Sequence, residues 1–163
     1  KINQNIINNF YFIPDSVMAC YYTTNNEVNC DLLLEKLFLC DNIKIALPAV
    51  EGKDKSLTFR QYQANDQLVK NKFFNFQEPA INQLQLLPNY IIVPILAFNK
   101  DKYRLGYGGG FYDRTIDSYK ESKHNFITIG AAYDFQLIAD HMHLPVESHD
   151  QQLDYIVTET EII

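Results

Sequence analysis

A short apolar run followed by a cluster of glycines constrains the fold of this chain more than any other stretch. The run covers residues 90–98 and contains the β-branched residues Ile91, Ile92 and Val93. β-Branched residues in a run too short for a buried helix predict a strand that is buried on both faces. Strands of this kind occur in parallel sheets covered by helices, so the run favours an α/β fold.

Four of the chain's six glycines follow this run within five positions: Gly106, Gly108, Gly109 and Gly110. Glycine accepts positive φ angles and lets backbone N–H groups approach a ligand without a Cβ atom in the way. A concave row of N–H groups at the start of a helix binds phosphate. Three consecutive glycines alone are more typical of a tight turn without a ligand, so the interpretation depends on the residues around them.

The glycines are flanked by four basic residues: Lys100, Lys102, Arg104 and Arg114. Asp113 falls in the first turn of the expected helix, where it can approach a divalent ion bound to the same phosphates. The dinucleotide fingerprint is excluded, because Gly106 and Gly108 would require a third glycine where Phe111 stands. The P-loop is excluded because the chain has no Gly-Lys-Ser or Gly-Lys-Thr. The pattern indicates a nucleotide–magnesium site of another kind.

These residues resemble a known family, the 5-formyltetrahydrofolate cyclo-ligases, also called methenyltetrahydrofolate synthetases. The family hallmark is a Val-Pro strand end, a turn, and then Arg-Leu-Gly-Tyr-Gly-(Gly/Lys)-Gly-(Phe/Tyr)-Tyr-Asp-Arg, which residues 93–114 match nearly throughout. Three further stretches resemble family motifs: residues 46–53, 131–136 and 144–150. Ala49 stands where the family has a basic residue, and the resemblance as a whole covers residues 17–159.

Helical and strand patterns alternate along the rest of the chain. We expect strands at residues 17–22, 43–47, 57–62, 90–98 and 126–129, and helices at residues 2–12, 32–40 and 111–119. The first two strands and the helix between them form a βαβ unit, which predicts a parallel pair. The sequence thus predicts one domain, residues 1–163, folded as a three-layer α/β sandwich around a mostly parallel sheet. This sandwich is Rossmann-like but lacks the dinucleotide fingerprint.

Residues 69–88 have no clean hydrophobic period, and we expect them to form a connection with a short helix. Within this segment Phe73, Phe74 and Phe76 are expected to pack it onto the body of the protein. Glu78 and Pro79 resemble a Glu-Pro pair of the family, which we interpret as a rigid turn.

The charge balance and the cysteines bear on partners and compartment. With 14 basic against 20 acidic residues the net charge is −6, which argues against nucleic acid or an anionic membrane as the main partner. The longest apolar run, residues 90–98, is shorter than the roughly 20 residues that span a bilayer. Cys20, Cys30 and Cys40 lie ten apart without a Cys-x-x-Cys pair, so we expect neither a zinc site nor a disulfide framework. We interpret them as buried apolar residues of a monomeric, cytoplasmic protein.

Two other kinds of site are rejected. Residues 148–150 are Ser, His and Asp, but contiguous side chains on an extended segment point apart and cannot converge as a catalytic triad. His141, His143 and His149 lack the helical spacing of a metal site, and histidines in a loop are more often solvated. The resemblance instead implies that Asp113 and Asp150 hold Mg2+.

The resemblance also implies the residues of the active site. ATP, as co-substrate, is expected to contact Arg104, Leu105, Gly106, Tyr107, Gly108, Gly109, Gly110, Phe111 and Tyr112. The folate is expected to contact Tyr22, Glu27, Tyr107, Gly108, Gly109, Gly110 and Phe111. Arg104 and Tyr107 are the expected catalytic residues. From the residues alone, Glu27 is more simply a solvated loop acid at the carboxyl end of the first strand.

The reaction implied is ATP-dependent closure of the formyl group of 5-formyltetrahydrofolate onto N10, giving 5,10-methenyltetrahydrofolate, ADP and phosphate. Such phosphoryl transfer needs alignment and charge neutralisation but no strong protein nucleophile. Two alternatives remain: a folate- or nucleotide-binding relative without turnover, and a Rossmann-type dehydrogenase, for which the glycine spacing is wrong.

The alternative without turnover is motivated by two departures from the family. Ala49 removes one positive charge, and the family carries a basic amino-terminal helix that reaches ATP, for which no counterpart precedes Lys1. On these grounds we expect the 163-residue chain to bind the folate but to handle ATP poorly.

Overall fold

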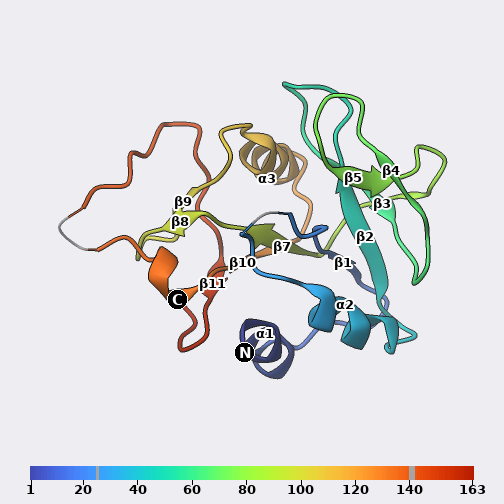
Figure 1. Cartoon of the computed structure of the whole chain (residues 1–163), viewed down its shortest axis with the longest axis horizontal. Coiled ribbons are helices and arrows are strands. Elements are labelled where there is room, and N and C mark those ends of the chain that lie inside the picture. Colours follow the sequence, from blue (N-terminus) through green and yellow to red (C-terminus); the bar gives the residue numbers. More distant parts are fainter. Residues whose placement is uncertain (25, 140–141) are drawn as a thin grey trace.

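The computed structural model describes residues 1–24, 26–139 and 142–163, and it has three layers. Figure 1 shows helix α3 on one face of a large sheet and helices α1 and α2 on the other. This arrangement confirms the predicted α/β sandwich. His141, one of the histidines considered above, lies outside the described residues.

The helices are α1 (Ile2–Asn9), α2 (Asp31–Phe38), α3 (Phe111–Glu121) and the 3-10 turn η1 (Asp134–Gln136). The strands of the large sheet are β1 (Val17–Ala19), β2 (Lys44–Ala49), β3 (Thr58–Gln61), β6 (Gln85–Leu86), β7 (Tyr90–Pro94), β10 (Ile127–Ala131) and β11 (Tyr155–Val157). Two hairpins stand apart from it: β4 (Leu68–Lys70) with β5 (Gln77–Pro79), and β8 (Ala97–Phe98) with β9 (Arg104–Leu105).

The large sheet runs in the order β11-β10-β7-β1-β2-β3-β6. The first five strands of this order are parallel, while β3 and β6 pair antiparallel at one edge. Strand β1 pairs with β2 on one side and with β7 on the other, so Ala19 lies opposite both Ala46 and Ile91. The chain therefore builds the sheet outward from β1 in both directions, which is the topology of a doubly wound fold.

The side chains of β7 enter both halves of the core, as its β-branched sequence predicts. Ile92 packs in the cluster beneath α1 and α2, together with Ile6 and Leu33. Ile91 and Val93 pack in the opposite cluster, beneath α3. Side chains of a strand alternate between faces, so a strand that is apolar at every position must be covered on both.

Two predicted elements are wrong. Residues 69–88 contain no helix in the structure but supply the β4–β5 hairpin and the edge strand β6. The single strand predicted at 90–98 is divided into β7 and β8, because the carbonyls of Ile95 and Leu96 leave the sheet and accept hydrogen bonds from the Gln136 side chain, at 2.7 and 3.2 Å. This contact explains the motif at residues 131–136, whose glutamine pins the connection between the two strands.

The cysteine prediction is correct in part. Cys20 and Cys30 are buried in the core, and burial raises the pKa of the Cys30 thiol to about 12. Cys40 is exposed instead, because it lies past the end of α2 on the outer side of a turn. All three are free thiols. Within the described part of the chain, the helices are too short or too polar to cross a bilayer.

Candidate functional site

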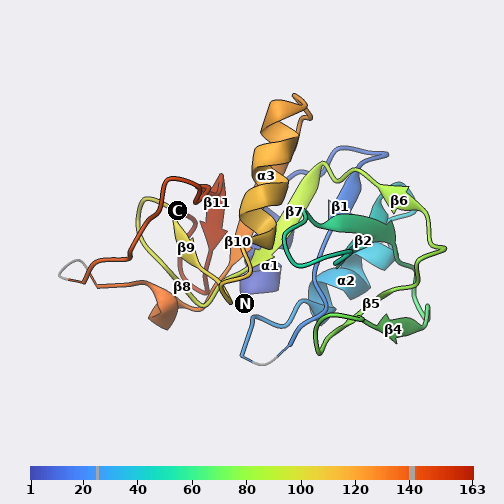
Figure 2. The same cartoon turned by 90° about the horizontal axis from the view of Figure 1, so that it is seen from above.

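Several of the predicted site residues follow strands that end where the two halves of the sheet meet. Strands β1 and β7 are neighbours, and their connections depart toward opposite edges, which makes the gap at their carboxyl ends the switch point where open α/β sheets bind ligands. Glu27 follows β1, and the glycine loop (residues 106–110) follows the β8–β9 hairpin and opens α3. Figure 2 shows the connection after β2, residues 50–57, beside the start of α3.

The glycine loop requires glycine for two different reasons. Gly108 and Gly110 have φ angles of 79° and 62°, in the left-handed region that residues with a Cβ atom rarely adopt. Gly109 has no room for a side chain, since an added Cβ would lie 2.7 Å from the Phe111 ring. An added Cβ at Gly106 or Gly108 would meet no atom within 4 Å. The loop is therefore packed on one side and open on the other.

Arg104 and Asp113 form a nearly buried ion pair below this loop. Their side chains are 5% and 17% exposed, and Arg104 Nη2 lies 3.0 Å from Asp113 Oδ1. Arg104 Nη1 also donates to the Gln151 carbonyl at 2.9 Å, while the Gln151 N–H donates to the same Asp113 oxygen at 3.0 Å. The pair thus joins β9, the first turn of α3 and the segment before β11. Sequence reasoning missed Gln151, because backbone groups leave no signal in residue type.

Asp150, the second predicted magnesium ligand, directly precedes Gln151. Its Oδ2 accepts a 2.8 Å hydrogen bond from the Glu147 N–H, and its own N–H donates to the Glu147 carbonyl at 3.0 Å. These bonds define a tight turn, and through Gln151 they place Asp150 next to the residue that holds Asp113. Two carboxylates suit Mg2+ by ligand type. Among the described residues there is no group of three or more His, Cys, Asp or Glu side chains that could hold a metal.

Arg114, one of the basic residues that flank the glycines in the sequence, has its partners within the protein. Its guanidinium donates to the carbonyls of Lys53, Lys55 and Gly109, at 3.1, 3.2 and 2.7 Å. The same group lies 5.0 Å from the centre of the Phe111 ring. Arg114 therefore fastens the glycine loop to the connection after β2.

Glu27 is buried rather than solvated, being 8% exposed. Its Oε2 accepts from the Thr24 N–H at 2.8 Å and from the Thr24 hydroxyl at 3.1 Å. Burial raises the pKa of Glu27, and the bonds from Thr24 partly oppose this rise. A buried carboxylate with a raised pKa at a switch point has the character of a functional group.

The Tyr112 hydroxyl is a buried donor without a hydrogen-bond partner among the described residues. Burial raises the pKa of Tyr112, the nearby Glu27 carboxylate raises it further, and Arg104 opposes the rise. Buried polar groups are normally hydrogen-bonded, so this hydroxyl is available to an ordered water, an ion or a ligand. Tyr112 at the start of α3 is thus within electrostatic reach of Glu27, which follows β1, and of Arg104 in β9, and we call these three residues the polar floor.

Two aromatic side chains of the predicted site are exposed. Tyr22 is 48% exposed and Tyr107 is 59% exposed, at the ends of segments that follow β1 and β9. Phe74, which was expected only to pack the connection, lies edge-on to Phe111 with ring centres 5.5 Å apart. The sequence did carry a signal for this aromatic packing, since three phenylalanines occur within residues 73–76. Flat exposed rings beside a glycine loop suit an aromatic ligand.

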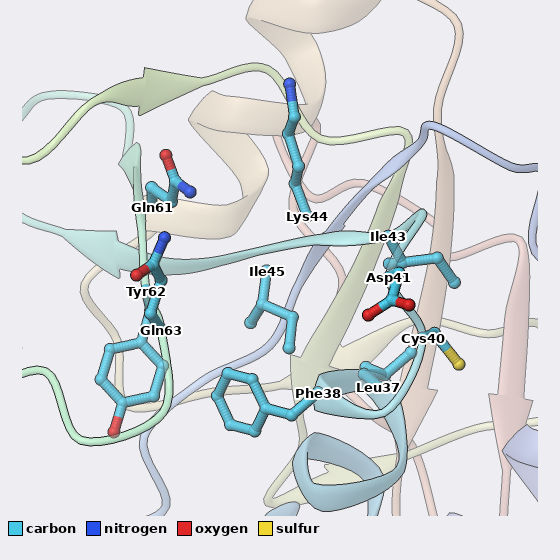
Figure 3. A pocket seen from close by; sticks show the side chains of 10 residues that line it. All are labelled: Leu37, Phe38, Cys40, Asp41, Ile43, Lys44, Ile45, Gln61, Tyr62 and Gln63. Atoms are coloured by element: carbon cyan, nitrogen blue, oxygen red, sulfur yellow. The ribbon is translucent and has the colours of Figure 1, made fainter.

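A separate hollow lies elsewhere on the molecule. It has a volume of about 250 Å3 and is lined by the end of α2, the turn that follows, the start of β2 and the end of β3 (Figure 3). None of the residues predicted to contact ATP, folate or Mg2+ lines this hollow. The candidate site is therefore the switch point and not this cavity.

Fold and site together define a doubly wound α/β protein with a glycine loop, of neither dinucleotide nor P-loop type, at its switch point. Residues 1–159 match the 5-formyltetrahydrofolate cyclo-ligase family. The chain therefore belongs to that family, as the resemblance in its motifs implied.

Individual relatives agree with this assignment. A 5-formyltetrahydrofolate cyclo-ligase of Mycoplasma pneumoniae is 40% identical over 163 residues, which cover 98% of this chain and 83% of that protein. The cyclo-ligase of Haemophilus influenzae is 32% identical over 141 residues, which cover 83% of this chain and 72% of that protein.

Solved structures show the same similarity. The 5,10-methenyltetrahydrofolate synthetase of Aquifex aeolicus superposes with a TM-score of 0.76 at 25% identity, covering 99% of this chain and 77% of that one. The synthetase of Mycoplasma pneumoniae superposes with a TM-score of 0.71 at 25% identity, and the match covers 96% of this chain and 81% of that one.

Proposed function

We propose that this chain catalyses the ATP-dependent conversion of 5-formyltetrahydrofolate to 5,10-methenyltetrahydrofolate, with release of ADP and phosphate. The observation that carries the proposal is the glycine loop with its buried Arg104–Asp113 pair, placed at the switch point of a chain that belongs to the cyclo-ligase family.

The reaction needs alignment more than it needs a protein nucleophile. The formyl oxygen attacks the γ-phosphorus of ATP, and ADP leaves. N10 then closes on the formyl carbon, and phosphate departs with the former formyl oxygen while N10 gives up its proton. Charge develops on the transferring phosphoryl group, so donors fixed in advance around it lower the barrier.

The residues divide this work as follows. Backbone N–H groups of Gly108, Gly109 and Gly110 bind phosphate oxygens at the start of α3, where the helix dipole favours negative charge. Arg104 binds Asp113 in the first turn of α3 and the carbonyl of Gln151, and it contributes positive charge to the site. The exposed ring of Tyr107, together with Phe111, offers a flat face to the pterin.

Tyr22 and Glu27 are assigned to the folate. The buried Glu27 carboxylate can accept hydrogen bonds from N–H groups of the pterin, and the unpaired Tyr112 hydroxyl can donate one to a ligand oxygen. Residues 104–107 and Tyr112 remain assigned to ATP.

Asp113 and Asp150 are assigned to Mg2+, which neutralises phosphate charge when it is bound with ATP. If both carboxylates contribute, Asp150→Asn should raise the magnesium concentration needed for half-maximal activity while leaving folate affinity nearly intact. Magnesium titration of turnover, with calorimetry of folate binding alongside, tests this assignment. An unaltered magnesium dependence would return Asp150 to the role of a turn residue.

Three ligands separate the proposed function from its alternatives. Titration with ATP-Mg, NAD and 5-formyltetrahydrofolate, followed by a turnover assay for the methenyl product, distinguishes an enzyme from a binding protein and from a dehydrogenase. The proposed function predicts binding of the first and third ligands with ATP-dependent turnover, which differs from the poor use of ATP expected from Ala49 and the residues before Ile2. Binding without turnover supports the non-catalytic alternative, and NAD binding supports the dehydrogenase.

We further infer that the protein acts as a single domain and a monomer in the cytoplasm. The free thiols of Cys20, Cys30 and Cys40 suit a reducing compartment. Light scattering across a range of concentrations measures the mass directly, and a dimer at the lowest concentration would contradict the inference.

A further inference from the structure

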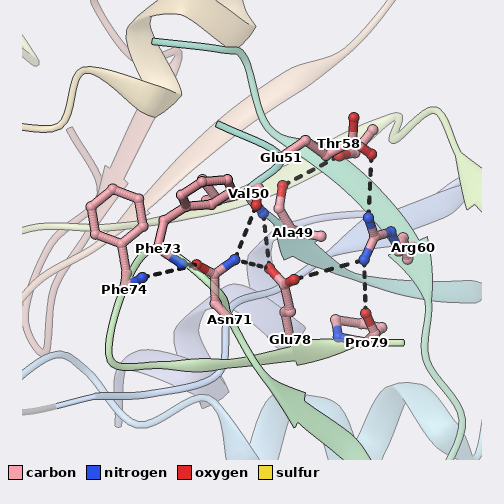
Figure 4. Close-up of polar contacts among 10 residues, drawn as sticks. All are labelled: Ala49, Val50, Glu51, Thr58, Arg60, Asn71, Phe73, Phe74, Glu78 and Pro79. Carbon is pink, nitrogen blue, oxygen red and sulfur yellow. Dashed lines mark hydrogen bonds and ion pairs between the residues drawn. The ribbon is translucent and has the colours of Figure 1, made fainter. Parts of the chain in front are cut away.

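A buried carboxylate outside the expected active site organises a polar network near it. Glu78 is 8% exposed, and its Oε2 accepts hydrogen bonds from the Val50 N–H at 2.9 Å and from Asn71 Nδ2 at 2.7 Å (Figure 4). Its Oε1 lies 3.9 Å from Arg60 Nη1. Glu78 and Pro79 belong to strand β5, so the rigid turn predicted for this pair is wrong. Removing a charged side chain from water costs free energy. A strand of this kind does not need a buried charged side chain for its own stability.

Asn71 is the second member of the network and uses its whole amide. Its Nδ2 donates to Val50 O at 3.0 Å as well as to Glu78, and its Oδ1 accepts from the N–H groups of Phe73 and Phe74 at 2.7 and 2.9 Å. Two donor and two acceptor sites are the full capacity of an asparagine amide. The side chain thus fixes the turn of residues 71–76 against the end of β2.

Two arms run from this network to the glycine loop. The first is the turn itself, whose Phe74 ring packs edge-on against Phe111 at 5.5 Å. Phe111 in turn fills the space where a Cβ at Gly109 would stand.

The second arm is the connection after β2, which begins at Val50. The Lys53 and Lys55 carbonyls of this connection accept hydrogen bonds from Arg114, which also binds the Gly109 carbonyl. Both arms therefore end on the same part of the glycine loop, and both start from groups that Glu78 and Asn71 bind.

We propose that Glu78 and Asn71 are positioning residues that hold the glycine loop in its phosphate-binding conformation before ATP arrives. This rests on the proposed function, in which that loop binds ATP. A loop with two glycines in the left-handed region has many other conformations available once its supports are removed. If only a fraction of molecules holds the competent loop, the apparent dissociation constant rises by the inverse of that fraction. Saturating ATP restores the competent form, so turnover at saturation changes little.

The test compares kinetic constants of three variants. Asn71→Ala and Glu78→Ala should raise KM for ATP about tenfold and change kcat less than about twofold, because they lower the population of the competent loop. Glu78→Gln keeps an oxygen that can accept from Val50 and Asn71, so it should recover most of the affinity for ATP. A merely structural role would instead lower kcat in proportion to the folded fraction and leave KM unchanged, which would overturn the proposal.

Asp154→Ala is the matched control. The Asp154 carboxylate accepts from the Thr128 N–H and hydroxyl, at 2.7 and 2.8 Å, and links β10 to the segment before β11, away from both arms. Its loss should lower the melting temperature without changing KM for ATP. A double-mutant cycle with Phe111→Leu should show coupling to Asn71→Ala and additivity with Asp154→Ala. If the free-energy effects are additive in both cycles, the proposed coupling through Phe74 and Phe111 is wrong.

A measurement without ligand separates this proposal from the proposed function. Backbone 15N relaxation of the free protein should show lower order parameters at Gly108–Gly110 in Asn71→Ala than in the wild type or in Asp154→Ala. If the wild type shows no ATP-dependent turnover, the proposed function fails and the order parameters alone decide the positioning role. Unchanged order parameters in Asn71→Ala would overturn it.

Discussion

Arg104 and Arg114 stand on either side of the glycine loop, and both already have partners within the chain. Arg104 is bound to Asp113 and Gln151, and Arg114 is bound to three carbonyls. Five rigid donors let one guanidinium join several segments, which an ammonium group cannot do. We therefore assign to these arginines the shape of the loop as well as its charge, and we assign the direct phosphate contacts chiefly to backbone N–H groups.

Glu27 gives a prediction in which stability and activity move in opposite directions. Because burial raises the pKa of Glu27, the folded state holds its proton more tightly than the unfolded state. The stability gained in this way is present below the unfolded pKa and is lost as the pH rises through the folded pKa. Gln cannot ionise, so the melting temperature of Glu27→Gln should exceed that of the wild type by a margin that grows from about pH 4 to about pH 7.

The same variant should bind 5-formyltetrahydrofolate more weakly, by about tenfold, because a charged acceptor for the pterin is lost. Calorimetry measures the affinity, and thermal melts at several pH values measure the stability. Glu35→Gln, at an exposed position of α2, is the matched control. If the difference in melting temperature between Glu27→Gln and the wild type shrinks with rising pH, or if folate affinity is unchanged, Glu27 does not belong to the site.

Residue types in the sequence predicted that the loop at residues 106–110 needs glycine, but they did not predict how the charged groups around it pair. The glycines were readable, because positive φ and close packing can be met by glycine alone. The pairing of Arg104 with Asp113 was not, since it depends on β9 and α3 meeting beside Gln151. Glu27 was misjudged as a solvated residue, because residue type alone does not show that the folded chain buries it.

At the scale of elements, the glycine loop works as a joint between the β8–β9 hairpin, α3 and the connection after β2. The N-cap residue of α3 is Gly110 in the left-handed conformation, and no side chain of the described residues caps the start of the helix. The first N–H groups of α3 are thus not taken by a capping side chain, and a phosphate can accept from them. The segments that support the glycine loop are residues 50–57 and 71–76. The hydrophobic periodicity of these segments did not predict that role.

The strands in residues 69–88 could not be predicted from the local hydrophobic pattern. Residues 69–88 have no clean period because β4 and β5 are short and their hairpin faces the end of β2 on one side only. Strand β7 was readable because both its faces are covered and every position is apolar. Short, half-covered elements are decided by tertiary contacts such as the bond from the Val50 N–H to Glu78, whose residues are 28 positions apart and so lie beyond a local window.

Gly109→Ala tests the joint. The added Cβ would lie 2.7 Å from the Phe111 ring, so the ring and the Arg114 guanidinium against it must shift. ATP affinity should fall about tenfold or more, while the melting temperature changes little, because the loop contributes few core contacts. Gly106→Ala, where an added Cβ meets no atom within 4 Å, should reduce affinity less. Equal affinities in the two variants would show that the packed side of the loop does not support phosphate binding.

At the scale of the whole molecule, the assigned site lies between two halves of the sheet, which in the described part of the chain pair through β1 and β7. One half carries β1, β2, β3, β6 and α2, and the other carries β7, β10, β11 and α3. Folate contacts are assigned to the segment after β1, and phosphate contacts to the start of α3. A bound pair of substrates therefore links both halves, and its binding free energy adds to the stability of the entire fold.

Ligand-induced stabilisation should consequently be global. At a concentration one hundred times its dissociation constant, a ligand that binds only the folded state stabilises it by about 2.7 kcal/mol. For a chain of this size the melting temperature rises by roughly 2–4 °C per kcal/mol, so we expect a shift of about 5–10 °C with ATP-Mg or with 5-formyltetrahydrofolate. NAD should give no shift, because the glycine loop does not have the dinucleotide spacing. Hydrogen exchange should slow in β1 and β2 as well as in β7 and β10 when both substrates are present. Slowing confined to one half would place the second substrate outside the switch point and contradict the assigned site.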